Sequence, residues 1–244
     1  MKRKQGYRRG HAVAHVVGLE EHHAVLWQVF SQVVKLHLKV ELGGRRSDER
    51  TLYNFHESVI DALRPVLKEG VRSIVVTAPS RTTYAADFIG HVRKHHAYLI
   101  HSKRLSRAVF AELVGSADTD SRVMELVKSK EFRKLVAETT SAEADRIVDM
   151  LEKYLYSNDS VVRYSLREIE GIVYCREKQD DLRLGYLVLT DKCLNSSQDK
   201  SRIHRLLQIS RNKKVKTRII NAETSAGMRI GQFGGIVFFT VPPE

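Results

Sequence analysis

The amino-acid sequence predicts an α/β protein with two domains. In several short stretches apolar residues alternate with polar ones, which is typical of strands, and in others they recur every three or four residues, which is typical of helices. A polar run, Ser-Asn-Asp-Ser at residues 157–160, separates two regions patterned in this way. We therefore expect a first domain over residues 1–156 and a second domain over residues 160–244.

The first domain is predicted to be a mixed-sheet α/β unit. Three strands are expected at its start, at residues 11–18, 22–30 and 33–42. A helix over residues 48–68 follows, with Pro65 near its end and Gly70 just beyond it. The pattern then predicts an apolar strand at 71–78, a helix at 83–96 and a short strand at 98–100. The charged stretch 105–156 is expected to be mostly helical.

The second domain is predicted to be a compact three-layer α/β unit. Ser165 and Glu168 have capping-box spacing and predict the start of a helix that ends near Tyr174. Strands are then expected at residues 184–190, 215–221 and 236–241, with helices at 199–212 and 226–232 between them. This alternation of strands and helices is typical of layered α/β domains.

A pair of glycines on basic arms, Gly43-Gly44, is the most informative feature of the chain. Strict alternation before it predicts that Lys35, His37 and Lys39 share one face of a half-buried strand. Glycine lets the backbone bend and approach another molecule closely, and arginines follow at positions 45, 46 and 50. Such a loop suits contact with RNA phosphates, although a plain turn has the same pattern.

Composition favours a polyanionic partner. The chain has 41 Lys+Arg against 29 Asp+Glu, a net charge of +12 and a pI near 9.7. Nucleic acid is the first candidate and an anionic membrane the second. The basic pair Arg93-Lys94 is either an RNA contact or a solvated helix end. The predicted RNA-binding residues are Lys35, Lys39, Arg45, Arg46, Arg50, Arg93 and Lys94.

Several other classes lack support in the sequence. We expect no membrane span, no signal peptide and a cytoplasmic location. Cys175 and Cys193 are too few for a disulfide framework, and the adjacent pairs His22-His23 and His95-His96 point their rings apart, so neither a metal nor another cofactor is expected. Neither a P-loop nor a Gly-x-Ser-x-Gly motif is present.

Most of the chain resembles the archaeal and eukaryotic class-one release-factor and Pelota superfamily. Residues 160–244 resemble its C-terminal domain through Tyr186-Leu187-Val188-Leu189-Thr190-Asp191, the strand 215–220, Glu223, Gly227 and Phe233-Gly234-Gly235-Ile236. Residues 11–156 resemble its central domain, with the glycine loop and the strand 74–79. The resemblance implies a paralogue without the large N-terminal domain, and a C-terminal domain similar to RNA-binding ribosomal proteins.

The resemblance implies a ribosome-associated translation factor in termination, rescue or quality control. Release factors of this superfamily carry Gly-Gly-Gln at the loop tip, where the amide positions the attacking water, but here Arg45 follows Gly43-Gly44. Arginine has donors and no acceptor, so we expect binding at the tRNA site without efficient ester hydrolysis, as in Pelota-type factors. The implied partners are the ribosome, its rRNA and tRNA, with a translational GTPase or a separate decoding subunit.

Two alternatives remain open at this point. The first is a peptidyl-tRNA hydrolase that uses the Gly-Gly-Arg loop, with Gly43, Gly44 and Arg45 as catalytic candidates. The second is a general RNA-binding protein.

Overall fold

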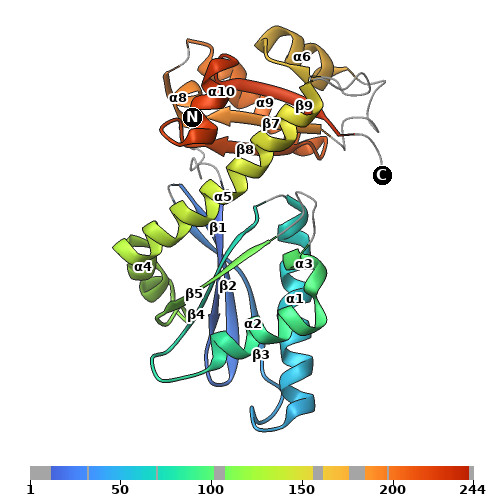
Figure 1. The fold of residues 1–244 in the computed structure, drawn as a ribbon. Helices are drawn as coiled ribbons and strands as arrows, with labels where there is room; N and C mark the ends of the chain where they lie inside the picture. Colours follow the sequence, from blue (N-terminus) through green and yellow to red (C-terminus); the bar gives the residue numbers. More distant parts are fainter. Residues whose placement is uncertain are drawn as a thin grey trace, which may run out of the picture. The chain divides into compact units, whose positions relative to one another are not determined.

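The protein is described here by a computed structural model (Figure 1), which covers residues 12–31, 33–69, 71–101, 108–155, 162–175, 185–196 and 198–241. Contacts divide the chain into two compact units, Met1–Thr140 and Ser141–Glu244. Each unit has its own mixed sheet with helices against it, so the predicted α/β class is confirmed. Among the described helices, none is long and apolar enough to cross a membrane.

The first unit is a five-stranded sheet in the order β3-β2-β1-β4-β5. Its strands are β1 (Ala12–Leu19), β2 (His23–Phe30), β3 (Val34–Glu41), β4 (Ser73–Ala78) and β5 (Val109–Val114). Strands β1, β2 and β3 form an antiparallel meander, while β4 pairs parallel with both β1 and β5. The meander and the parallel pairs together make the mixed sheet that the sequence predicts.

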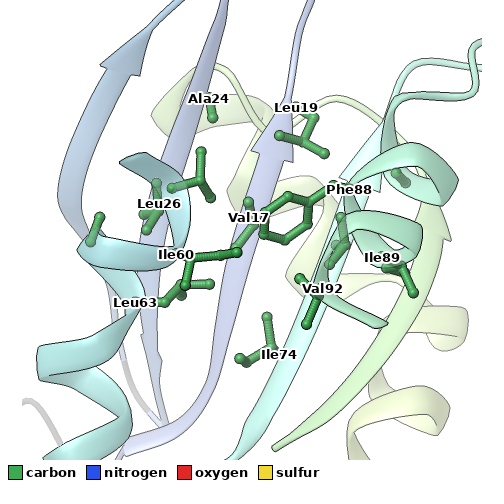
Figure 2. Packing of buried hydrophobic residues seen from close by; sticks show 14 of the residues in the cluster. Val17, Leu19, Ala24, Leu26, Ile60, Leu63, Ile74, Phe88, Ile89 and Val92 are labelled. Atoms are coloured by element: carbon green, nitrogen blue, oxygen red, sulfur yellow. The ribbon is translucent and has the colours of Figure 1, made fainter. Parts of the chain in front are cut away.

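Helices cover both faces of this sheet. On one face α1 (Glu49–Glu69), α2 (Tyr84–His95) and α3 (Ala97–His101) enclose the main core, in which Val17, Ile60 and Phe88 are fully buried (Figure 2). On the other face the core contains residues of α4 (Asp120–Lys128) and of the first half of α5 (Lys130–Leu155), together with Trp27. The central strands β1, β2 and β4 are therefore buried on both sides, whereas the edge strand β3 is largely exposed.

One predicted element in this unit is wrong, and one strand was not predicted. Residues 98–100 belong to the short helix α3 and not to a strand, because Leu99 packs into the core beside α2. The last strand is instead β5, inside the stretch that was expected to be helical. Its six residues are apolar except for Glu112 and show no strict alternation with polar residues, so the period-two pattern of a strand is lacking.

A bulge in β3 changes the predicted face of that strand. Leu26 pairs with Leu38 and Trp27 with Leu36, which leaves His37 as an extra residue. An extra residue reverses the alternation of side chains beyond it. Lys35 and Lys39 therefore lie on opposite faces of the sheet, and the expected single cationic face does not form.

The second unit has the sheet order β6-β9-β7-β8. Its strands are β6 (Val162–Arg163), β7 (Gly185–Thr190), β8 (Lys216–Ile220) and β9 (Ile236–Thr240). Its helices are α6 (Leu166–Tyr174), α8 (Asp191–Ser196), α9 (Lys200–Asn212) and α10 (Ser225–Gln232). Helices α6 and α9 pack with Leu187 and Phe238 on one face of the sheet.

The second half of α5 belongs to this second unit. Glu143 pairs with Arg218 of β8 at 2.6 Å, and Glu152 pairs with Arg229 of α10 at 2.6 Å. These contacts place α5 and α10 together beside the sheet and form the third layer. The division between the units thus lies within α5. The linker predicted at residues 157–160 is outside the described residues, and the domain boundary there stays a prediction.

Candidate nucleic-acid interface

The Gly-Gly loop connects β3 to α1 and is fixed at both ends. At its start, the backbone N–H of Leu42 donates to the carbonyl of His22 over 2.7 Å. At its end, the Asp48 carboxylate accepts from the backbone N–H of Thr51 at 3.2 Å and from the Thr51 hydroxyl, as an N-cap does. The tip between these anchors, from Gly43 to Arg45, is exposed.

The two glycines at the tip differ in what the fold requires of them. Positive φ angles occur at other glycines of the described chain and at neither of these two. A Cβ added at Gly43 would meet no atom within 4 Å, whereas one at Gly44 would lie 3.1 Å from the Thr51 side chain. Packing therefore leaves the Gly43 position open, and its missing side chain gives another molecule room to approach the backbone.

Arg46 holds the loop to the rest of the unit. Its Nε donates to the carbonyl of Glu21 over 2.8 Å, and its Nη2 donates to the carbonyl of Glu20. Its guanidinium also lies over the Tyr84 ring, 3.9 Å from the centroid, and 5.3 Å from that of Phe55. Burial lowers the pKa of Arg46 below its usual value, but an arginine remains charged at neutral pH. This arginine is structural, which leaves Arg45 and Arg50 as the exposed cations of the loop region.

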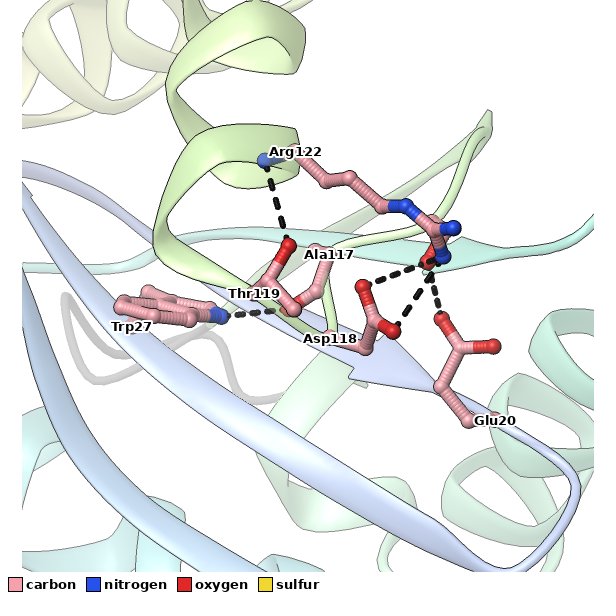
Figure 3. A network of polar contacts seen from close by, with 7 residues as sticks. Glu20, Trp27, Ala117, Asp118, Thr119 and Arg122 are labelled. Atoms are coloured by element: carbon pink, nitrogen blue, oxygen red, sulfur yellow. Dashed lines mark hydrogen bonds and ion pairs between the residues drawn. The ribbon is translucent and has the colours of Figure 1, made fainter.

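Four loops meet at the carboxyl edge of the sheet. Strands β1, β3, β4 and β5 all point the same way, so residues 20–22, 42–48, 79–83 and 115–119 follow strand ends at one edge. The Glu20 carboxylate there accepts from the Ser116 hydroxyl, and Arg122 donates to the Asp118 carboxylate at 3.2 Å (Figure 3). Trp27 donates to the carbonyl of Ala117 over 2.7 Å. The network is linked to the Gly-Gly loop through Glu20, whose carboxylate accepts from Ser116 and whose carbonyl accepts from Arg46.

The other predicted RNA-binding residues are placed unequally. Lys39 pairs with Glu41 at 2.7 Å, so its charge is partly balanced. Lys35 is exposed on the opposite face of β3. Arg93 and Lys94 are exposed in the last turn of α2, about 14 Å along the helix axis from Tyr84, which contacts Arg46. The seven residues therefore form no single patch.

Tyr53 is a residue of this surface that the sequence argument missed. It lies three residues after Arg50 on α1, and residues at this spacing are neighbours on a helix surface. The residue is 43% exposed, and its ring lies 5.2 Å from the ring of His95, the residue next to Lys94. Tyr53 thus connects the arginine side of α1 to the basic end of α2. Exposed aromatic rings among cations are typical of surfaces that stack nucleic-acid bases.

The most specific motif of the second unit has a structural role. Thr224 caps α10 by accepting from the backbone N–H of Gly227 at 3.1 Å, and a Cβ at Gly227 would lie 1.9 Å from the carbonyl oxygen of Asn221. Gly235 has a φ of 83°, in the left-handed region that favours glycine. These residues fix the turn from β8 to α10 and the entry into β9.

Comparisons with known proteins agree with this arrangement. No protein-family model matches the sequence. The Pelota homolog of Pyrococcus abyssi is 23% identical over 192 residues, which cover 79% of this chain and 49% of that protein. The chain is thus similar in sequence to a Pelota homolog over most of its own length, and it spans about half the length of this curated relative.

Solved structures of the same group share the fold. An archaeal Pelota, in a model of ribosome-bound Pelota and ABCE1, is 16% identical with a TM-score of 0.57, and the match covers 98% of this chain and 64% of that one. Dom34 of S. cerevisiae is 20% identical with a TM-score of 0.51, over 98% of this chain and 66% of that one. These matches show that the chain shares the fold of these Pelota and Dom34 structures.

Proposed function

We propose that this protein is a ribosome-associated translation factor in ribosome rescue or quality control. The observation that carries the proposal is the exposed Gly43-Gly44-Arg45 tip on a Pelota-like fold. In this proposal the tip faces the acceptor end of the tRNA site, Arg45 and Arg50 contact RNA phosphates, and Tyr53 adds a stacking surface. The location would be cytoplasmic.

The similar proteins support this proposal through what is described for them. The archaeal Pelota is described as ribosome-bound, together with ABCE1. Dom34 is described as a translation termination-like factor that is involved in RNA quality control pathways and interacts with Hbs1. By analogy we infer that this chain contacts rRNA and tRNA and works with a partner factor, either a translational GTPase or a separate decoding subunit.

The chemistry of the tip supports binding without efficient hydrolysis of peptidyl-tRNA. A water that attacks an ester needs a group that accepts one of its hydrogens, and a guanidinium offers donors alone. Arg45 is exposed at the loop tip, where the related release factors carry glutamine. The alternative is a hydrolase in which the Arg45 guanidinium stabilises the developing oxyanion.

Ribosome binding at different salt concentrations tests the electrostatic part of the proposal. We expect the double variant Arg45→Gln/Arg50→Gln to cosediment more weakly with ribosomes. The slope of the logarithm of its binding constant against the logarithm of the salt concentration is expected to decrease in magnitude by up to about one unit for each phosphate contact removed. The matched control is Arg133→Gln/Lys134→Gln, which removes two exposed charges from α5 in the same unit. Equal slopes for both double variants would contradict the assignment. Equal affinity of the wild type for free RNA and for ribosomes would favour a general RNA-binding protein.

Peptide release from ribosome–nascent-chain complexes tests the catalytic part. We expect release near background with the wild type and with Arg45→Ala, because positioned proton transfer to or from water accounts for about two to four orders of magnitude in rate. Robust release by the wild type that Arg45→Ala abolishes would establish the hydrolase alternative. Release gained by Arg45→Gln would indicate that the loop still presents its tip in a productive position.

A further inference from the structure

Three potential metal ligands converge between α1 and the end of α2. Nε2 of His91 lies 2.9 Å from Oε1 of Glu57, and Nε2 of His96 lies 2.7 Å from the same oxygen. One ligand atom from each side chain lies within 4.8 Å of the other two. Within the described part of the chain, this Glu-His-His group is the one set of three or more such residues that meets this criterion.

The local backbone explains why these two histidines share a side. Residues five apart in a continuous helix point about 140° away from each other. Helix α2 ends at His95, and His96 has the non-helical angles φ −127° and ψ 39°. This change of direction turns the His96 ring back towards His91 and Glu57.

The surroundings are those of a partly enclosed site. The side chains of His91 and His96 are each 8% exposed, and that of Glu57 is 27% exposed. In the described chain, the ion-pair partners of the Glu57 carboxylate are these two imidazoles. Both Nε2 atoms lie at hydrogen-bond distance from the Glu57 carboxylate, which only accepts, so each ring donates its Nε2 proton to that carboxylate in this arrangement. A metal ion would replace these two protons, and the proton of each neutral ring would then be on Nδ1, which in His96 has no hydrogen-bond partner among the described residues.

We propose that Glu57, His91 and His96 bind a divalent transition-metal ion, with Zn²⁺ as the best match. Two imidazole nitrogens and one carboxylate oxygen are a common donor set for zinc, usually with a fourth position for water. Each imidazole Nε2 lies at hydrogen-bond separation from the carboxylate oxygen, and the three ligand atoms lie within 4.8 Å of one another. Tetrahedral zinc would hold its donor atoms about 3.3 Å apart, so each nitrogen–oxygen pair would open by roughly half an ångström to admit the ion.

Nothing in the sequence indicated a metal at the adjacent histidine pairs. Of His95 and His96, the first is exposed and the second is buried, and their ring centroids lie 4.7 Å and 5.9 Å from that of His91. The ligands come instead from positions 57, 91 and 96, which only the packing of α1 against α2 brings together. A bound ion would crosslink these two helices. It would thereby fix the relative positions of Tyr53 and the basic end of α2.

Metal titration of the untagged full chain tests the proposal directly. We expect the chelator-treated protein to bind one Zn²⁺ by calorimetry and to give the visible absorption of tetrahedral Co²⁺, which Zn²⁺ then displaces. Zn²⁺ is also expected to raise the thermal unfolding midpoint followed by Trp27 fluorescence, since a ligand that binds the folded state stabilises it. The absence of saturable Zn²⁺ and Co²⁺ binding by the wild type would overturn the proposal without any variant.

Variants identify the ligands. Glu57→Gln keeps an oxygen that accepts from the histidines but is a poor zinc ligand, so its fold is expected to survive. We expect Glu57→Gln and His91→Gln each to raise the Zn²⁺ dissociation constant by about 100-fold, since even outer-shell changes cost 10- to 100-fold. The control His22→Gln changes an exposed histidine and is expected to bind as the wild type does. Unchanged affinity in both ligand variants would refute this site.

Discussion

Replacing Arg46 by alanine separates the structural arginine from the exposed ones. The change removes two hydrogen bonds to backbone carbonyls, those of Glu20 and Glu21, and the contact with the Tyr84 ring at 3.9 Å. A hydrogen bond contributes about 1 kcal/mol net, and a partly exposed cation–π contact about 0.5–1 kcal/mol. The free energy of unfolding of the first unit is therefore expected to fall by about 2–3 kcal/mol.

Urea unfolding followed by tryptophan fluorescence measures this change in one unit. Trp27 is the single tryptophan of the sequence, and it is buried in the first unit. Its fluorescence therefore reports on that unit without a contribution from the other. In a thermal experiment the same loss corresponds to roughly 5–10 °C, since 1 kcal/mol shifts the midpoint of a domain of this size by about 2–4 °C.

Two variants serve as controls for Arg46→Ala. Arg45→Ala removes the neighbouring exposed charge and is expected to stay within about 0.5 kcal/mol of the wild type. Arg46→Lys keeps the charge, but lysine cannot reach both carbonyls. The stability of this variant is therefore expected to lie between that of Arg46→Ala and that of Arg45→Ala. If Arg46→Ala were as stable as Arg45→Ala, the structural role assigned to Arg46 would be refuted.

Three further predictions concern the loop, the pH dependence and the second unit. Gly43→Ala is expected to leave urea unfolding unchanged, because its Cβ meets no neighbour, and to weaken ribosome cosedimentation; a destabilised fold would contradict this. Burial holds the pKa of His15 at about 4 in the folded protein, whereas the pKa in the unfolded chain is about 6.5. As the pH falls from about 6.5 to about 4, His15 is protonated in the unfolded chain before it is protonated in the folded protein, so the free energy of unfolding decreases by up to about 3 kcal/mol. His15→Leu should flatten this slope between about pH 7 and pH 5, and an equal slope in the variant would count against it. A fragment of residues 141–244 is expected to melt at a higher temperature by circular dichroism than one of residues 160–244, which lacks the Glu143–Arg218 pair at 2.6 Å; equal melting would argue for the shorter domain.

Much of the fold follows from local patterns in the sequence. The strands before the Gly-Gly loop, the helix after it and the alternation of elements in the second unit follow from periodic patterns that are visible in a short stretch of sequence. The expected strand at 98–100 failed because so short an apolar run fits a helix as well as a strand. The strand β5 was missed because its short apolar run lacks the strict alternation of a half-buried strand and lies within a charged stretch.

The parts of the site that were missed depend on tertiary contacts. The sequence shows that Arg46 is basic, but only the folded hairpin of β1 and β2 brings the carbonyls of Glu20 and Glu21 to its guanidinium. The bulge at His37 arises where β3 pairs with β2, and the alternation of residues within β3 does not predict it. Tyr53 likewise meets His95 only through helix packing. The sequence thus shows which residue types are present in the site, but not which residues contact one another in the folded protein.

The bulge at His37 also has a consequence for solubility. Strand β3 is the edge of its sheet, and an open edge offers unpaired backbone groups to the edges of other molecules. Leu36 and Leu38 are 50% and 46% exposed, and in a regular strand they would form one apolar stripe along that edge. The extra residue puts them on opposite faces and interrupts the ladder at the same point. The strand that leads into the Gly-Gly loop is therefore a poor template for intermolecular β-pairing, and the loop stays available at high protein concentration.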